Sequence, residues 1–302
     1  MYLKLVVSFM ALSFILCKIA AKPNHNFPTQ SRIKRTPYNL NPAIPDESIC
    51  GNSVYANEVR GYRSAFIGEF PWVARIQFEQ TKGLFPCEGA LINSRYVVTT
   101  GMCTTFKRFG NIVKIRLGDH NCQNNYIACK TEYIDVGPEE IITHRDYYIE
   151  EEHHIPNNIG LIRLDREIHY SDTVQPICLP KPEEAPLKVG ELVIESGWFS
   201  NYRNSDDKIL AEFYIVPLED CIEFYKKRNA SVLESNICAQ GANNSLCATC
   251  TGGPLTQRRG SRKWYLEGIL SFSSFICGNI SFPSAYTDVR YYLDWIHTNV
   301  RN

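Results

Sequence analysis

The chain has 302 residues, of which 44% are hydrophobic and 12% aromatic, enough to form a large packed core. Lys and Arg together number 32, as do Asp and Glu, so the formal net charge of +0 gives no reason to expect binding to nucleic acid or to a charged membrane surface. The length suits one large all-β domain with short extensions.

The N-terminus has the composition of a secretory signal. Lys4 precedes an apolar run over residues 5–16, and the small residues Ala20 and Ala21 follow. This run is shorter than a membrane-spanning helix needs, although a membrane anchor is the alternative interpretation. We therefore expect residues 1–21 to be a signal peptide and the mature protein to be secreted and extracellular. Cys17 lies in this segment, so 11 of the 12 cysteines remain, an odd number in an oxidising compartment.

Residues 22–49 show no periodicity and are rich in Pro, Asn and Ser, which predicts a flexible N-terminal arm. The arm contains a basic stretch, 32–35, that ends at Arg35. This stretch resembles a proprotein-convertase site, and a solvated basic patch is the equally open alternative. The domain itself is expected over residues 50–302. It carries three N-x-Ser/Thr acceptors for glycosylation, at Asn229, Asn243 and Asn279.

Short β-rich runs bounded by turn residues recur along the domain. The predicted strands cover residues 96–100, 113–117, 192–195, 209–216 and 265–272. Two helices are expected. Asp220 is the predicted N-cap of a short helix that continues to Tyr225. At the C-terminus an apolar helix face is formed by Val289, Leu293, Ile296 and Val300. Many short strands and one terminal helix indicate a closed or sandwiched all-β fold.

One motif gives the family away. Residues 247–255 read Cys-Ala-Thr-Cys-Thr-Gly-Gly-Pro-Leu, which resembles the nucleophile motif Cys-x-Gly-Asp-Ser-Gly-Gly-Pro-Leu of chymotrypsin-like serine proteases. The similarity to that family is continuous from Cys50 onward. Its other motifs lie at residues 68–73, 87–92, 96–103, 160–164, 176–180, 196–198 and 285–296.

The resemblance implies two packed six-stranded antiparallel β-barrels with a C-terminal α-helix. It also implies five disulfides, which sequence alone cannot assign. The implied pairs are Cys50–Cys178, Cys87–Cys103, Cys122–Cys129, Cys221–Cys238 and Cys247–Cys277. Cys250 is left over. Arthropod relatives carry a six-cysteine clip domain before the protease, but the arm has no cysteine until Cys50, so no clip domain is expected.

The three catalytic positions of the family all carry other residues here. Met102 stands where the histidine base belongs, and a thioether accepts no proton near neutral pH. Asn158 stands where an aspartate orients that histidine, and it has no charge to stabilise an imidazolium. Thr251 replaces the serine nucleophile, and a threonine nucleophile needs an adjacent base. We therefore predict no catalytic residues.

The surrounding positions are changed as well. Thr249 replaces the oxyanion-hole glycine, where a β-branched residue fits poorly. Cys250 replaces the aspartate that pairs with a freed N-terminal ammonium during activation, and no basic residue precedes Val59. Conventional zymogen activation is therefore not expected. In the specificity pocket Ser245 replaces the acidic floor residue, and serines at 273 and 284 replace two wall glycines, which should narrow the slot.

Cys250 has three open interpretations: a buried inert thiol, an intermolecular disulfide, or a reactive nucleophile. Two metal sites were considered. Asp119 and Asn121 fall in a loop that binds calcium in some trypsins, but the carboxylate set is incomplete. Residues 150–154, Glu-Glu-Glu-His-His, are better explained as a solvated charged loop. We expect no metal and no cofactor.

These features resemble the arthropod non-catalytic serine protease homologues. The resemblance implies a secreted protein that binds other extracellular proteins, proteases or their zymogens, as a cofactor or regulator of immune or melanisation cascades. One alternative is a hydrolase of the same fold with residual or altered activity through Thr251 or Cys250. Another is a structural or ligand-binding protein outside any cascade.

Overall fold

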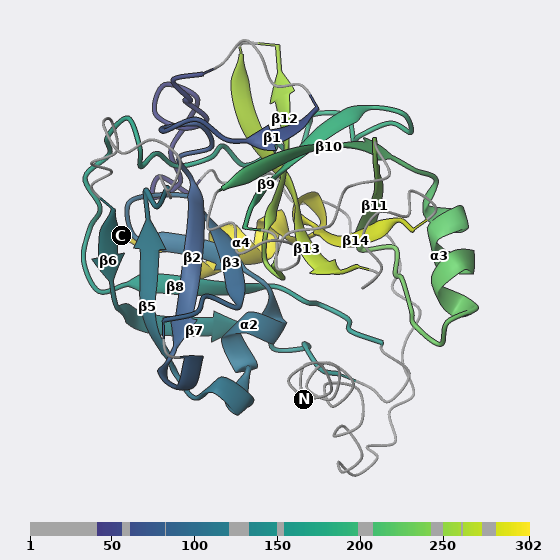
Figure 1. Cartoon of the computed structure of the whole chain (residues 1–302), viewed down its shortest axis with the longest axis horizontal. Helices are drawn as coiled ribbons and strands as arrows, with labels where there is room; N and C mark the ends of the chain where they lie inside the picture. Colours follow the sequence, from purple (N-terminus) through teal and green to yellow (C-terminus); the bar gives the residue numbers. More distant parts are fainter. Residues whose placement is uncertain are drawn as a thin grey trace, which may run out of the picture.

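The structure is a computed structural model of the whole chain. It describes residues 41–55, 61–81, 83–120, 133–149, 154–198, 208–242, 250–260, 262–273 and 282–302. Two β-sheets lie side by side in it (Figure 1), the first formed by the N-terminal half of the domain and the second by the C-terminal half. This arrangement confirms the all-β prediction of two packed barrels.

The first sheet is antiparallel, with the strand order β6-β5-β2-β3-β4-β8-β7. Its strands are β2 (Val73–Phe78), β3 (Cys87–Leu91), β4 (Tyr96–Thr99), β5 (Ile112–Leu117), β6 (Ile134–Val136), β7 (Pro138–Thr143) and β8 (Gly160–Leu164). Contacts between β5 and β7 bring the sheet round on itself. Alternating burial along β2, with four of its six residues buried, follows from one strand face packing on the core.

The second sheet has the order β1-β10-β11-β14-β13-β12-β9, and an additional pairing of β9 with β10 closes it into a barrel. Its strands are β1 (Tyr62–Ser64), β9 (Leu192–Gly197), β10 (Ile209–Ile215), β11 (Asn236–Gly241), β12 (Pro254–Arg259), β13 (Lys263–Phe272) and β14 (Ser284–Asp288). Each sheet therefore has seven strands among the described residues rather than the predicted six. The additional strands, β1 and β6, have three residues each and extend a six-stranded ring.

The C-terminal helix forms as predicted. The 3-10 turn η3 (Val289–Tyr292) leads into α4 (Leu293–Asn299). Val289, Leu293, Ile296 and Val300 are all buried, as a single apolar face requires. Figure 1 shows α4 crossing behind the two sheets, between β3 and β13.

The prediction for Asp220 is wrong. Helix α3 (Leu218–Lys226) begins two residues earlier, and Pro217 occupies its N-cap without a side-chain cap bond. Proline at a helix start has its φ already near the helical value and has no N–H to satisfy, so the helix can begin there. Asp220 lies in the first turn, where its negative charge favours the helix dipole.

Three of the implied disulfides are present: Cys50–Cys178, Cys87–Cys103 and Cys221–Cys238. The other two, Cys122–Cys129 and Cys247–Cys277, lie outside the described residues. The segment before Cys50 packs on the domain. The Asn41 side-chain amide donates to the carbonyl of Val300 at 2.6 Å, and its backbone N–H donates to Nδ1 of His297 at 3.3 Å.

Residues 1–40 are not described, so the signal peptide and the Arg35 site are not tested. In the part of the chain that is described, no helix has the length and apolarity needed to cross a membrane.

Candidate functional site

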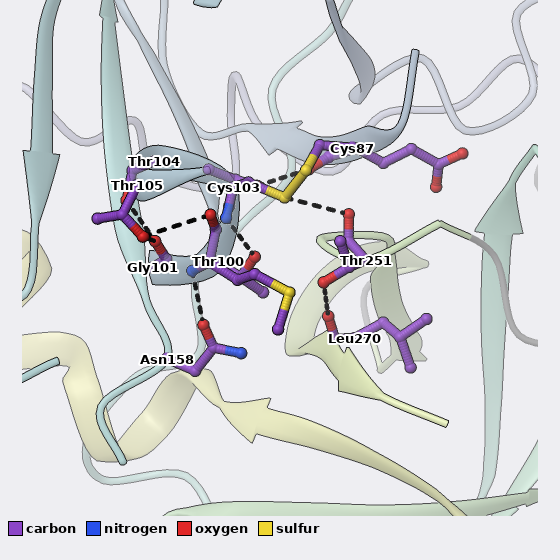
Figure 2. Close-up of a disulfide and its surroundings, with 12 residues drawn as sticks. Cys87, Thr100, Gly101, Cys103, Thr104, Thr105, Asn158, Thr251 and Leu270 are labelled. Carbon is purple, nitrogen blue, oxygen red and sulfur yellow. Dashed lines mark hydrogen bonds between the residues drawn. A yellow bond between two sulfur atoms is a disulfide. The ribbon is translucent and has the colours of Figure 1, made fainter. Parts of the chain in front are cut away.

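The altered centre lies where the two sheets meet, beside the short helix α2 (Gly101–Thr105). Thr100 caps this helix because its hydroxyl accepts the N–H of Cys103 at 3.2 Å. The Cys87–Cys103 disulfide then joins the helix to β3. Figure 2 shows this disulfide between α2 and Thr251, with Asn158 on the other side of the helix. The backbone frame thus places Met102 at the position of the missing base.

Asn158 is 1% exposed and uses both ends of its amide. Its Oδ1 accepts the backbone N–H of Met102 at 2.9 Å, and its Nδ2 donates to Oγ of Ser271 at 2.7 Å. Its carbonyl accepts the hydroxyl of Thr287 at 2.8 Å. An amide suits this place because it is neutral and can both accept and donate. The residue therefore ties the two sheets together and does no proton chemistry.

Thr251 is held by its backbone and turned toward its own sheet. Its carbonyl accepts the N–H of Glu88 at 2.9 Å, and its hydroxyl donates to the carbonyl of Leu270 at 3.3 Å (Figure 2). A hydroxyl whose proton goes to a backbone carbonyl is not activated for attack, since nothing in that bond removes the proton.

The turn after Thr251 depends on glycine. Gly252 has φ +91, and a Cβ there would lie 2.0 Å from the carbonyl oxygen of Glu88. Its N–H donates to the carbonyl of Leu270 at 2.9 Å, which fixes the turn on β13. The motif glycine is thus present for a steric reason that does not involve catalysis.

Cys250 carries a thiol that donates to the carbonyl of Trp198 at 3.3 Å. Burial, aided by the negative charge of Glu88, raises the pKa of this thiol far above its ordinary value. The thiolate, which would be the nucleophile, is therefore disfavoured. This geometry suits the interpretation of Cys250 as an inert packed thiol.

The specificity slot is bridged by the two serines that replace wall glycines. Oγ of Ser273 and Oγ of Ser284 lie 2.9 Å apart, and Ser284 is 3% exposed. The register explains this, because β13 and β14 pair Phe272 with Ala285 in the adjacent position. Below them the hydroxyl of Tyr225 donates to the carbonyl of Pro283 at 2.5 Å. The slot is narrowed at these walls, as expected, and Ser245 and Thr249 lie outside the described residues.

The candidate metal positions are only partly described. Oδ2 of Asp119 pairs with an Arg75 guanidinium nitrogen at 2.6 Å, so this carboxylate already has a cation. Asn121 and residues 150–153 lie outside the described part. Within that part no three His, Cys, Asp or Glu side chains gather as a metal site would require.

The sequence-based reading missed two buried charged residues beside the centre, Glu88 and Lys208. Glu88 lies in β3, and Oε1 accepts the N–H of Trp198 at 2.6 Å. Lys208 precedes β10, and its ammonium donates to the carbonyl of Phe70 at 3.3 Å. The available signal was a charged residue directly next to an apolar strand run, as in Cys87-Glu88-Gly89-Ala90-Leu91.

Known proteins share this fold and sequence. The trypsin family model matches residues 59–296. A phenoloxidase-activating factor 3 from Holotrichia diomphalia is 33% identical, covering 96% of this chain and 84% of its own length. Melanization protease 1 from Drosophila melanogaster is 32% identical, covering 92% of this chain and 74% of its own.

Among solved structures, the Drosophila Grass clip serine protease of the Toll pathway aligns with a TM-score of 0.66. The two chains are 27% identical, and the match covers 83% of this chain and 75% of that one. This likeness agrees with the two-barrel fold and with the disulfide frame described above.

Proposed function

The chain belongs to the trypsin family of serine proteases, and we propose that it is a secreted member that has given up catalysis and acts by binding other proteins. The observation that carries the proposal is the state of the three catalytic positions. Met102 has no proton acceptor, Asn158 is spent on hydrogen bonds between the sheets, and Thr251 donates to a backbone carbonyl. Loss of such a triad costs about a million-fold in turnover in a comparable enzyme.

The bridged slot supports the same proposal. A long basic side chain could enter only if the Ser273–Ser284 contact opened. The two rings still hold their connecting loops in fixed positions, which suits recognition of another protein. The names of the relatives, a phenoloxidase-activating factor and a melanization protease, suggest the setting. We propose that the partners are proteases or zymogens of such an extracellular cascade.

The proposed organisation is a signal peptide over residues 1–21, an arm over 22–49 and the protease-like domain over 50–302. Glycosylation at Asn229 is part of this proposal. The residue is exposed in the turn after α3, where an acceptor would be accessible. An intermolecular disulfide through Cys250 would require its thiol to leave the Trp198 carbonyl.

The competing function is a hydrolase that uses Thr251 or Cys250. Purified mature protein should be treated with a serine-reactive phosphonate and with a panel of peptide substrates, beside an active trypsin as positive control. We expect no labelling and no cleavage, with Thr251→Ala and Cys250→Ala indistinguishable from the parent chain. Stoichiometric labelling that Thr251→Ala abolishes would falsify the proposal.

The binding role is tested by pull-down from extracellular fluid with the tagged mature chain. We expect protease zymogens to co-purify. Recovery of other ligands without any protease would favour a structural role outside a cascade. N-terminal sequencing of the same secreted material tests processing, since cleavage after Arg35 would leave Thr36 first, and intact residues 22–35 would argue against it.

A further inference from the structure

A group of buried or half-buried charges lies between the start of β10 and the first sheet. Its centre is Lys208, which is 3% exposed and whose ammonium donates to the carbonyl of Phe70. Three carboxylates, Glu69, Asp119 and Glu88, act electrostatically on that ammonium. Burying a lysine costs free energy unless opposite charges compensate it, so these carboxylates explain how it is tolerated.

Two of the carboxylates have arginine partners. Glu69 pairs with Arg63 at 2.8 Å, and Asp119 pairs with Arg75 at 2.6 Å. Lys208 is the third cation and Glu88 the third carboxylate of the group, so its charges balance three against three. The balance assigns Lys208 to Glu88 as counter-charge, whereas the arginines serve the other two carboxylates first.

The backbone places both residues at the altered centre. In the antiparallel register Ile209 is opposite Gly197, so Lys208 follows opposite Trp198. Glu88 accepts the N–H of Trp198, and the carbonyl of Trp198 accepts the thiol of Cys250. The space is tight, since a Cβ on Gly197 would lie 2.2 Å from Oε2 of Glu88. One carboxylate thus fixes the strand end that in turn holds Cys250.

The segment that follows the family's activation site passes the same place. Ser64 pairs with Ile209, and the N–H of Ala65 donates to the carbonyl of Lys208 at 2.7 Å. An internal ammonium therefore lies beside the path of the chain whose freed end would supply an ammonium in an activated protease.

We propose that Lys208 and Glu88 are positioning residues that form a built-in substitute for the activation ion pair. Their buried charges order the segment around Trp198 and Cys250 in the intact chain, so this centre reaches its final conformation without cleavage. The inference concerns conformation and does not depend on the absence of peptidase activity or on the identity of a binding partner.

The test is amide hydrogen exchange on the intact mature protein and on four variants. These are Lys208→Met, Glu88→Gln, the double variant, and Lys188→Met as a matched control at an exposed lysine. The amides to follow are those of Trp198 and Gly252, with the amides of β4 as an internal reference. Each single variant leaves one buried charge without its counterpart, whereas the double variant leaves neither.

In the uncleaved parent we expect both amides to be protected. Each single change should accelerate their exchange at least tenfold relative to β4, and the double variant should exchange more slowly than either single variant. Lys188→Met should match the parent. Unprotected amides in the intact parent, unaffected single variants, or effects that simply add in the double variant would each overturn the pairing. If a single variant does not fold, a double variant that also fails overturns it.

Discussion

Two parts of the altered centre contrast sharply: the backbone frame and the cleft side chains. In the frame, the Cys87–Cys103 disulfide, the Thr100 cap and the Gly252 turn satisfy every geometric demand of the fold. In the cleft, Met102 and Thr251 satisfy none of the demands of acyl transfer. The difference teaches that fold and reaction make separate demands on one small region. Variants in the frame should therefore damage stability, and variants in the cleft should cost stability only where they bring in a charge.

The largest effect is expected from Gly252→Ala. The new Cβ would meet the Glu88 carbonyl at 2.0 Å in a left-handed backbone conformation, and neither can move without breaking the turn. We expect the free energy of unfolding to fall by about 4 kcal/mol in chemical denaturation. Gly260→Ala is the control, because a Cβ there meets nothing within 4 Å. Equal stability of the two variants would contradict the frame argument.

Removing the disulfide of α2 comes next. Replacing Cys87 and Cys103 by alanine opens a link with a sequence separation of 16, which should cost about 3 kcal/mol. Cys250→Ala, in the same site, removes only a packed thiol and should cost about 1 kcal/mol. Thermal unfolding of the two variants side by side measures the difference. A larger loss for Cys250→Ala would show that the thiol, and not the link, stabilises the centre.

Asn158→Asp tests the cleft. At pH 7 the new carboxylate would be buried without a cation, at a cost of about 2 kcal/mol. Burial should raise its folded pKa above the unfolded value. Its stability contribution is then present at low pH and lost as pH rises through the folded pKa, so the deficit should shrink toward pH 4. Unfolding measured across that range checks this, and a deficit that grows on acidification would refute it.

The smallest effect concerns His297, far from the cleft. Burial lowers the pKa of this half-buried imidazole to about 4. Between pH 4 and the unfolded value near 6.5 the unfolded chain binds more protons, so stability should rise with pH in that window. Protonation also removes the Nδ1 acceptor of Asn41. His297→Gln should flatten the profile, as thermal unfolding at several pH values can show, and an unchanged slope would exclude this residue.

Much of the fold could be predicted from residue patterns. Runs of β-branched residues marked β4, β5 and β10, and a single apolar face marked the terminal helix. The short strands β1 and β6 could not be predicted, because three residues carry no periodic signal and form strands only through their neighbours. The start of α3 was misplaced since Asp220 is a good cap residue in isolation, whereas Pro217 fixes the actual start.

The site divides in the same way. Met102, Asn158 and Thr251 could be found because strong flanking motifs fix their positions. Glu88 and Lys208 could not, since a charged residue beside an apolar strand can face water or the interior with the same local sequence. Only the neighbouring strand end at Trp198 and the loop at Phe70 decide that both are buried.

The Cys50–Cys178 disulfide has a practical consequence for anyone who handles this protein. It joins residues 128 positions apart in the chain. A protease that cuts one peptide bond between them makes two polypeptides but one particle, with unchanged mass apart from a water molecule. Such a nick is invisible on a non-reducing gel and appears only after reduction. Samples judged intact by size alone can therefore be mixtures of one-chain and two-chain molecules.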